Sequence, residues 1–149
     1  MSEEILKVTV DKFTFLVPKG LLYSDAGVWM KLEGNRVRLG LSDFAQQQNG
    51  DLAFASIKPV GTVLESGDAF AEIETVKVDV SIPSPLRGTI VELNPSLAGA
   101  PELINQDPYG QGWMAVVEPT DWDSDRARLL APQAYLDLVK NQADAEMKR

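Results

Sequence analysis

The segment from Glu72 to Ile82 alternates apolar and polar residues, and the alternation changes phase in its middle. The apolar or β-branched residues occupy odd positions first and even positions afterwards: Ile73 and Thr75, then Val76, Val78, Val80 and Ile82. Because successive side chains of a strand point to opposite faces, a single strand cannot keep this set on one core. The pattern therefore predicts two strands joined by a tight turn, with Lys77 at or beside its tip, although no Gly, Asn or Pro marks that turn.

Two short stretches flank this segment and repeat one another. Residues 61–65 read GTVLE, and residues 88–92, which begin 27 positions later, read GTIVE. A solenoid needs at least three repeats, so two copies favour a pseudo-symmetric pair of related strand units.

Four other segments have the composition of strands. Alternation over residues 28–41, across a turn that contains Gly34, predicts a hairpin with one buried face. Residues 52–57 and 89–93 end at turns that contain proline, and residues 113–117 are apolar throughout, as in a strand buried on both faces. The body of the chain is therefore predicted to be mainly β.

Two helices are predicted, one short and one near the C-terminal end. Ser42 is a good N-cap for a helix at residues 43–49, and Gly50 suits the position after its last turn. Pro132 suits the first turn of the second, amphipathic helix. The inward stripe of that helix is expected at Tyr135, Leu138, Val139 and Gln142. Residues 140–149 are expected to form a frayed tail.

Length and composition limit the kinds of function. The 149 residues suit one domain, residues 1–149, and a net charge of −8 from 14 basic and 22 acidic residues disfavours nucleic acid and anionic membranes as partners. The chain has no cysteine and no histidine, which excludes a thiol nucleophile, a disulfide, an imidazole base and a Cys/His metal site. No apolar stretch approaches the ~20 residues of a membrane span, so a soluble, cytoplasmic protein is expected.

Few side chains offer chemistry of their own. Glu72 and Glu74 lie two positions apart in a predicted strand, on one face and about 7 Å apart, which is within the range of paired catalytic carboxylates. A solvated strand face in an acidic protein explains them more simply, and the serines have no histidine partner, so no catalytic residue is predicted. Lys77 differs, because an amine at the tip of a rigid hairpin can enter a modifying enzyme and then carry a tethered group.

The sequence around Lys77 contains a series of motifs. They are ETVK at residues 74–77 with Gly88 eleven positions after the lysine, GTVLESGDAF at 61–70, and SPLRG at 84–88. Further stretches are GLSDFAQ at 40–46, GD at 50–51, PELIN at 101–105 and DPYGQGW at 107–113. Together they resemble the glycine cleavage H-protein family over residues 23–139. The later motifs distinguish this family from shorter lipoyl domains, and the valines beside Lys77 argue against a biotin carrier.

This resemblance implies a barrel-sandwich hybrid fold, as in lipoyl domains, with two pseudo-symmetric halves. It also implies that Lys77 holds lipoic acid in amide linkage and that a lipoate-attaching enzyme favours Gly61, Glu74 and Gly88. These glycines, with Gly67, are expected to be turn residues. The chain is then a non-catalytic swinging-arm carrier. Glycine decarboxylase, aminomethyltransferase and dihydrolipoamide dehydrogenase are the partners that the resemblance implies.

The chain departs from the family where a cationic amine would be held. The usual His-Glu pair before the tryptophan is replaced by Gly27 and Val28, and the acidic residue usual four positions after the lysine is Ser81, with Asp79 as a candidate substitute. This pattern resembles the lipoate-binding proteins of heterodisulfide-reductase-like sulfur oxidation, so a carrier of sulfur intermediates that serves such a complex is slightly favoured. A glycine cleavage carrier of the aminomethyl group is the alternative. An unmodified β interaction module is a further alternative.

Overall fold

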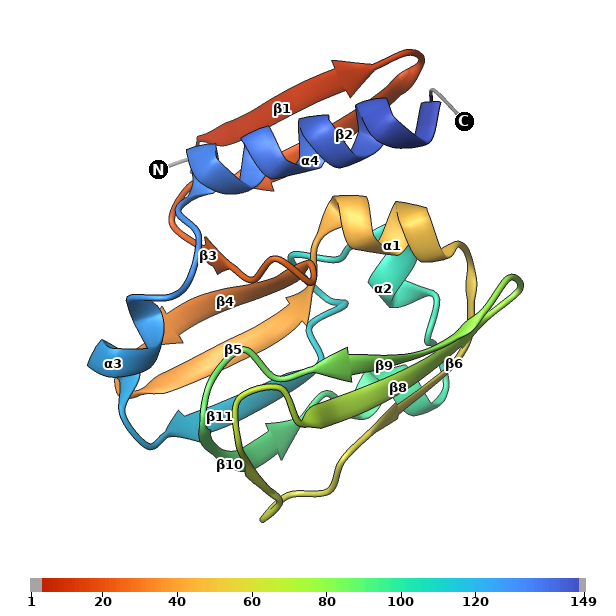
Figure 1. Ribbon diagram of the computed structural model, residues 1–149. Coiled ribbons are helices and arrows are strands. Elements are labelled where there is room, and N and C mark those ends of the chain that lie inside the picture. Colours follow the sequence, from red (N-terminus) through yellow and green to blue (C-terminus); the bar gives the residue numbers. More distant parts are fainter. Residues whose placement is uncertain (1–3, 148–149) are drawn as a thin grey trace.

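Within residues 4–147, which the computed structural model describes, the strands form three antiparallel sheets. The largest has the order β3 (Leu22–Tyr23), β4 (Val28–Glu33), β5 (Arg36–Leu41), β11 (Ala115–Pro119), β10 (Gly88–Leu93) and β7 (Val63–Leu64). The second has the order β6 (Leu52–Ile57), β8 (Ala69–Thr75) and β9 (Asp79–Pro83), and the third pairs β1 (Ile5–Val10) with β2 (Phe13–Pro18). Figure 1 shows the two larger sheets below and the β1–β2 hairpin above them.

The main hydrophobic core lies between the two larger sheets. Leu39, Ile90 and Val117 contribute to it from the six-stranded sheet, and Ile73 and Ile82 contribute from the three-stranded sheet. Each sheet turns one face inward, as in a β-sandwich. The predicted mainly β fold with a barrel-sandwich body is confirmed.

The two repeated stretches pair with one another. In the β7–β10 pair Val63 lies opposite Thr89, and the pairing continues where Ile90 N donates to Thr62 O at 2.9 Å. Thr62 and Val63 of the first copy are equivalent to Thr89 and Ile90 of the second. If the two copies change places, the Val63–Thr89 pair therefore becomes the Ile90–Thr62 pair, and a local two-fold axis relates the two copies. The two pseudo-symmetric halves therefore meet at this strand pair.

Helices cover the ends of this body. They are α1 (Asp43–Asn49), the 3-10 helix η1 (Pro95–Ala98), α2 (Leu103–Gln106), α3 (Trp122–Arg126) and α4 (Pro132–Met147). Ser42 caps α1, since its Oγ accepts from Ala45 N at 3.2 Å, and Gly50 ends it. The predicted short helix at 43–49 and the predicted hairpin at 28–41 are confirmed.

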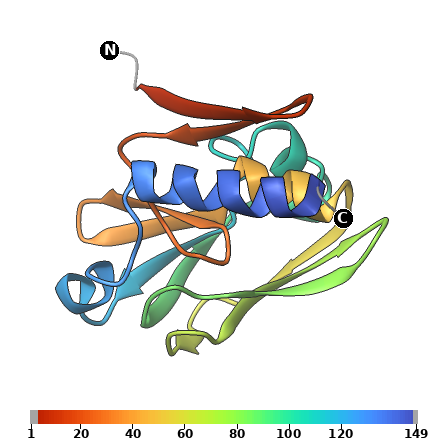
Figure 2. The same cartoon turned by 45° about the horizontal axis from the view of Figure 1, so that its top comes forward.

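A second hydrophobic core lies between α4 and the β1–β2 hairpin, a hairpin that the sequence patterns did not predict. Phe15 packs edge-on against Phe44 of α1, with ring centroids 5.0 Å apart, and Tyr135 stacks on Tyr23 at 4.5 Å. Figure 2 shows α4 running beside the hairpin in this upper layer. The free edge of β2 is satisfied by side chains of the body: Asp43 Oδ2 accepts from Leu16 N, Tyr109 Oη donates to Leu16 O, and Gln47 Nε2 donates to Thr14 O.

This second core explains why β4 differs from its prediction. The alternation predicts one buried face, yet Val28, Trp29 and Met30 are all buried. Val28 and Met30 face the main core, whereas Trp29 faces the second core. Both faces of the sheet are therefore covered at the start of β4, and the prediction of one buried face is wrong there.

The C-terminal helix is longer than predicted. α4 continues to Met147, so the frayed tail expected over residues 140–149 is wrong for residues 140–147, and the last two residues lie outside the described part. Gln142 is exposed, and Ala143, only 1% exposed, takes the inward position after Val139. The tail is ordered because Ala143 packs in the second core.

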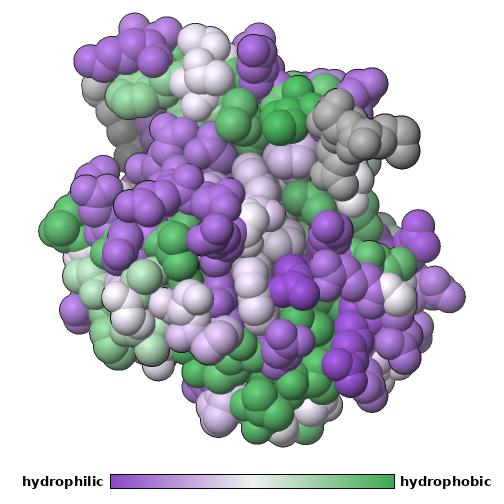
Figure 3. All heavy atoms as spheres, turned by 180° about the vertical axis from the view of Figure 1, so that it is seen from behind, coloured by the Kyte–Doolittle hydropathy of each residue, from purple (hydrophilic) through white to green (hydrophobic). Residues whose placement is uncertain are grey.

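The surface is largely hydrophilic. Figure 3, which shows the molecule from behind, has hydrophilic and hydrophobic residues mixed over its upper part and hydrophobic residues gathered at its lower end, where the β6–β7 connection lies in Figure 1. Val60 and Val63 are large hydrophobic residues exposed in this region. Residues 4–147 include no helix that is both long and apolar enough to cross a membrane.

Candidate functional site

Lys77 lies in the turn between β8 and β9, as the phase change predicts. Val76, Lys77 and Val78 form this turn, and all three are exposed. Thr75 closes it, because its Oγ1 accepts from Lys77 N at 3.1 Å and from Val78 N at 3.0 Å, while Thr75 N donates to Val78 O at 2.8 Å. Thr75 thus supplies the local bonds that Asn or Asp more often supplies in turns. Sequence reasoning missed this role, although a threonine just before a predicted turn is its signal.

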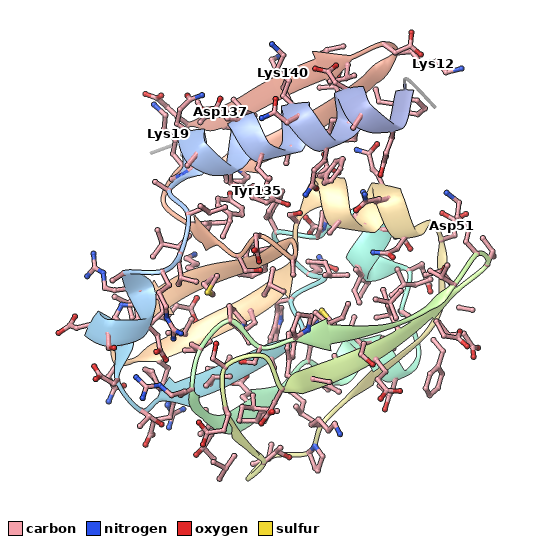
Figure 4. The ribbon with its side chains drawn as sticks, in the orientation of Figure 1. Lys12, Lys19, Asp51, Tyr135, Asp137 and Lys140 are labelled. Atoms are coloured by element: carbon pink, nitrogen blue, oxygen red, sulfur yellow. The ribbon has the colours of Figure 1, made fainter. Side chains whose placement is uncertain are left out.

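The C-terminal end of α1 supports the tip from one side. Val76 N donates to Asp51 O at 3.2 Å, and the Lys77 stem carbons Cγ, Cδ and Cε lie 3.5–3.7 Å from the place that a Cβ on Gly50 would take. Gly50 has a φ of 90°, which favours glycine. Figure 4 places Asp51 beside the β8–β9 tip, away from Lys12, Lys19 and Lys140 of the upper layer. The stem of Lys77 therefore lies over the end of α1.

Asn105 fixes this end of α1 to the body. Its Nδ2 donates to Gln46 Oε1 and to Gly50 O, both at 3.0 Å, and its Oδ1 accepts from Leu52 N at 2.9 Å. The connection from α1 to β6 is held on both sides of Gly50 by one side chain. Residue type gave no signal for this role, since an asparagine in a Pro-rich connection predicts only a turn.

The outer face of the three-stranded sheet lies directly beside the tip. We call the outer face the set of exposed residues Phe54, Ser56, Glu72, Glu74, Asp79 and Ser81. Glu72 and Glu74 share this face, as predicted, and Glu74 is three residues before Lys77. The outer face lines a shallow groove of about 290 Å³. This open sheet surface suits contact with another molecule better than it suits a catalytic pair, which needs an enclosed cleft.

A hollow of about 350 Å³ lies between α1 and α4. Asp25 lines it from the β3–β4 connection, Gln48 from α1, and Tyr135 and Glu146 from α4. Gln48 Nε2 donates to Glu146 Oε1 at 2.5 Å, and burial raises the pKa of Tyr135 to about 12. Gln48 is two residues before Gly50, or about 3 Å along the helix axis. The hollow therefore contains two acidic residues, Asp25 and Glu146, and Glu146 contacts Gln48 near the end of α1 over which Lys77 lies.

Packing explains why Gly27 and Val28 stand where the resemblance leads one to expect His and Glu. Gly27 has a φ of 89°, and a Cβ on it would lie 2.7 Å from the Cβ of Ala45, so no larger side chain fits. Val28 is buried in the main core. Asp79 and Ser81 belong to the outer face. The carboxylates of the hollow are instead supplied by other positions of the chain.

Gly61 and Gly88, the two glycines predicted to matter for attachment, do not lie beside the β8–β9 turn. Gly61 is a turn residue with a φ of 95°, and Gly67 is another with a φ of 94°. Gly88 is not a turn residue, which corrects the prediction: it begins β10, where a Cβ would collide with the backbone of Glu118 in β11. Gly61 and Gly88 lie at the β7–β10 junction, whereas Lys77 lies at the far end of the other sheet.

An ion-pair cluster around the buried carboxylate of Asp125 secures the opposite side of the molecule. The carboxylate of Asp125 accepts from Arg128 Nη2 at 2.7 Å and from Arg87 N at 2.8 Å, and lies 3.1 Å from Arg87 Nη2. Burial by itself raises the pKa of Asp125, but the hydrogen bonds from Arg87 outweigh it and hold the pKa below its usual value. The cluster fastens α3 to the β9–β10 connection, away from Lys77 (Figure 1).

Comparisons with known proteins agree with the resemblance noted in the sequence. The model of the Glycine cleavage H-protein family matches residues 21–142. The glycine cleavage system H protein of Bacillus licheniformis is 39% identical over 123 residues, which are 83% of this chain and 96% of the relative, and that of Geobacillus thermodenitrificans is 41% identical over 122 residues, 82% and 95%. A crystal structure of a glycine cleavage system H protein from Mycobacterium marinum superposes with a TM-score of 0.74 and 30% identity, covering 81% of this chain and 97% of that one. The β1–β2 hairpin precedes the matched span.

Proposed function

The chain belongs to the glycine cleavage H-protein family, and we propose that Lys77 is the residue that carries its lipoyl group. Members of this family carry a lipoate covalently attached to a lysine, and their partner enzymes perform the catalysis. The observation that carries the proposal is the exposed amine of Lys77 at the tip of a turn that Thr75 locks. When bound, the lipoyl group supplies the reversible thiol chemistry that a chain without cysteine lacks.

The residues present fit this modification. The Nζ of Lys77 would hold the lipoyl group through an amide bond, and the group would supply thiol–disulfide chemistry at the end of the arm. The exposed turn lets an enzyme surround the amine, and the hydrogen bonds of Thr75 hold the backbone of Lys77 in one conformation. The Lys77 stem lies against Gly50, whose φ of 90° favours glycine there.

The proposed cargo is the aminomethyl group of glycine cleavage. The relatives named above are glycine cleavage system H proteins, which favours this cargo over the sulfur intermediates that the altered motif suggested; the comparisons give that suggestion no support. A physical reason supports the amine: the carboxylates of Asp25 and Glu146 line a hollow near the anchor of the arm, and carboxylates are suitable partners for a cation. Glycine decarboxylase, aminomethyltransferase and dihydrolipoamide dehydrogenase are the proposed partners.

Intact-mass measurement tests the attachment. Protein isolated from its native cell is expected to carry one lipoyl group, mapped to Lys77 by peptide sequencing. Lys77→Arg is expected to remain unmodified while it unfolds at the wild-type temperature, because the substitution changes only an exposed turn. Lys58→Arg, at another exposed lysine, is the matched control and is expected to be modified fully. A lipoyl group on another lysine would overturn the assignment.

The same preparation tests the cargo. Lipoylated protein with its disulfide intact, incubated with glycine and glycine decarboxylase, is expected to gain the mass of glycine less that of the carbon dioxide released, and Lys77→Arg is expected to gain nothing. A lipoylated chain that fails to load, beside a Bacillus licheniformis H protein that loads under the same conditions, would overturn the cargo and leave the attachment intact.

A further inference from the structure

We propose that the outer face of the three-stranded sheet is the surface on which the lipoate-attaching enzyme docks, and that it receives an arginine side chain of that enzyme between Phe54, Glu72 and Asp79. This inference rests on the proposed function, because it needs Lys77 to be the attachment site. It concerns residues beyond Glu74, whose part in attachment the family resemblance already implies.

The strand register arranges the outer face in two rows that cross the sheet. In the row nearer the tip Phe54 lies opposite Glu74, and Glu74 lies opposite Asp79. In the next row Ser56, Glu72 and Ser81 lie side by side in the same way. The groove between these side chains therefore has an aromatic wall on β6, two carboxylates along its middle on β8, and a third on β9.

The charges of the outer face destabilise the folded chain when no partner is bound. Two acidic residues directly opposite one another in a sheet repel, and Glu74 and Asp79 are such a pair. Within residues 4–147 no lysine or arginine lies in ion-pair contact with Glu72, Glu74 or Asp79. Phe54 is also 57% exposed, which costs hydrophobic free energy that burial would recover. A partner that brings a cation and covers the ring removes both costs.

The guanidinium group of arginine has the chemistry that this groove fits. It is planar and cationic, it stacks on aromatic rings, and its N–H groups donate in pairs to carboxylates. An arginine laid against Phe54 would direct its donors toward the neighbouring carboxylates of β8 and β9. Lysine has a point charge and no flat face, so it matches the aromatic wall less well.

The position of the groove identifies which partner uses it. Before modification the reactive atom is Lys77 Nζ, at the end of a short side chain, so the attaching enzyme must close directly over the turn. The Glu74–Asp79 pair begins only two to three residues from Lys77, or about 7–10 Å of strand, and falls inside that footprint. Enzymes that act later meet a reactive group at the end of a much longer arm and need not touch the sheet. The exposed valines of the turn, Val76 and Val78, extend the same contact surface.

Lipoylation kinetics test the proposal with the full-length chain, lipoate, ATP and the purified attaching enzyme. Glu72→Gln and Asp79→Asn are each expected to lower kcat/KM about 3- to 10-fold, mainly through KM, as for loss of one charge-assisted contact. The effect is expected to shrink as salt is raised. Glu92→Gln, at an exposed glutamate of β10, is the matched control and is expected to behave as wild type.

Stability separates this role from a structural one. Because Asp79→Asn relieves repulsion from Glu74, it is expected to keep or raise the unfolding temperature while it slows modification. Phe54→Leu, which keeps apolar bulk and removes the flat ring, is expected to slow modification as well. If the double variant Glu72→Gln, Asp79→Asn is modified within twofold of wild type, the docking surface is wrong although Lys77 is the site. If wild type itself is not modified, the proposed function fails first.

Discussion

The two outlying hairpins of the molecule, β1–β2 and β8–β9, differ in where the contacts of their exposed groups lie. The β1–β2 hairpin buries Phe15 and Val17 against α1 and α4, and the edge of β2 is satisfied by side chains of the body. The β8–β9 hairpin belongs to the three-stranded sheet, whose outer face has Glu74 opposite Asp79 and, on the neighbouring strand β6, an exposed Phe54. One hairpin is shaped by contacts within the chain. The other keeps polar and apolar groups whose best partners lie outside it.

The difference shows how the tip of a hairpin can be held without being covered. The β1–β2 hairpin is held by packing, whereas the strands β8 and β9 pack on the main core and their exposed tip is held by Thr75, Asp51 and the end of α1. Packing would cover the surface that a modifying enzyme must reach. Local hydrogen bonds hold the turn and leave Lys77 exposed.

Replacing one phenylalanine of β2 and one of β6, the strand that pairs with the β8–β9 hairpin, tests the comparison most strongly. Phe15→Ala is expected to lower the free energy of unfolding by about 3–5 kcal/mol, because it empties a buried site against Phe44. Phe54→Ala is expected to change it by less than about 0.5 kcal/mol, since the ring is mostly exposed. Denaturant unfolding measures both. Equal losses would mean that the two rings contribute alike to stability.

Thr75→Val tests the source of rigidity at the tip. The substitution keeps the shape of the side chain and removes the hydroxyl that accepts from Lys77 N and Val78 N, so a loss of about 1–2 kcal/mol is expected. Amide hydrogen exchange at residues 76–78 is expected to accelerate, while exchange in β1 and β2 stays as in wild type. Unchanged exchange at the tip would show that Asp51 and α1 hold it without Thr75.

Tyr135→Phe gives the smallest effect and concerns the upper layer alone. Loss of the 2.6 Å hydrogen bond to Ser42 is expected to cost about 1 kcal/mol at neutral pH. Burial raises the folded-state pKa of Tyr135 to about 12, above its ordinary value of about 10, so the stability from its neutral form is complete below about pH 10 and is lost as the pH rises through about 12. The variant should lack this alkaline loss. An equally steep decline in the variant would assign it to another group.

Period-two patterns were enough to predict β4, β5, β6 and the β8–β9 turn, because those strands alternate on one main core. They failed where a second core reverses the expected burial. Trp29 occupies a position that alternation assigns to solvent, and Ala143 lies where the stripe of α4 was expected to fray. Both are buried in the second core together with the β1–β2 hairpin, which precedes the span that the family model matches.

The residues of the candidate site likewise divide into those that local sequence patterns could locate and those that they could not. Lys77 could be located because a phase change is a property of neighbouring residues. Asn105 could not, because its role depends on Gln46 and Leu52, which a long connection brings beside it. The carboxylates of Asp25 and Glu146 come from opposite ends of the chain and share a hollow only after α4 has packed on the body. Juxtapositions of this kind leave no trace in local patterns.

The junction of β7 with β10 bears on how such a chain could arise. Its two copies meet through equivalent residues, so the contact is isologous, like that of a symmetric dimer. A peptide with a single copy would have an edge strand that can pair with the same strand of a second identical peptide. Duplication and fusion of its gene would convert that dimer into one chain without changing the contact.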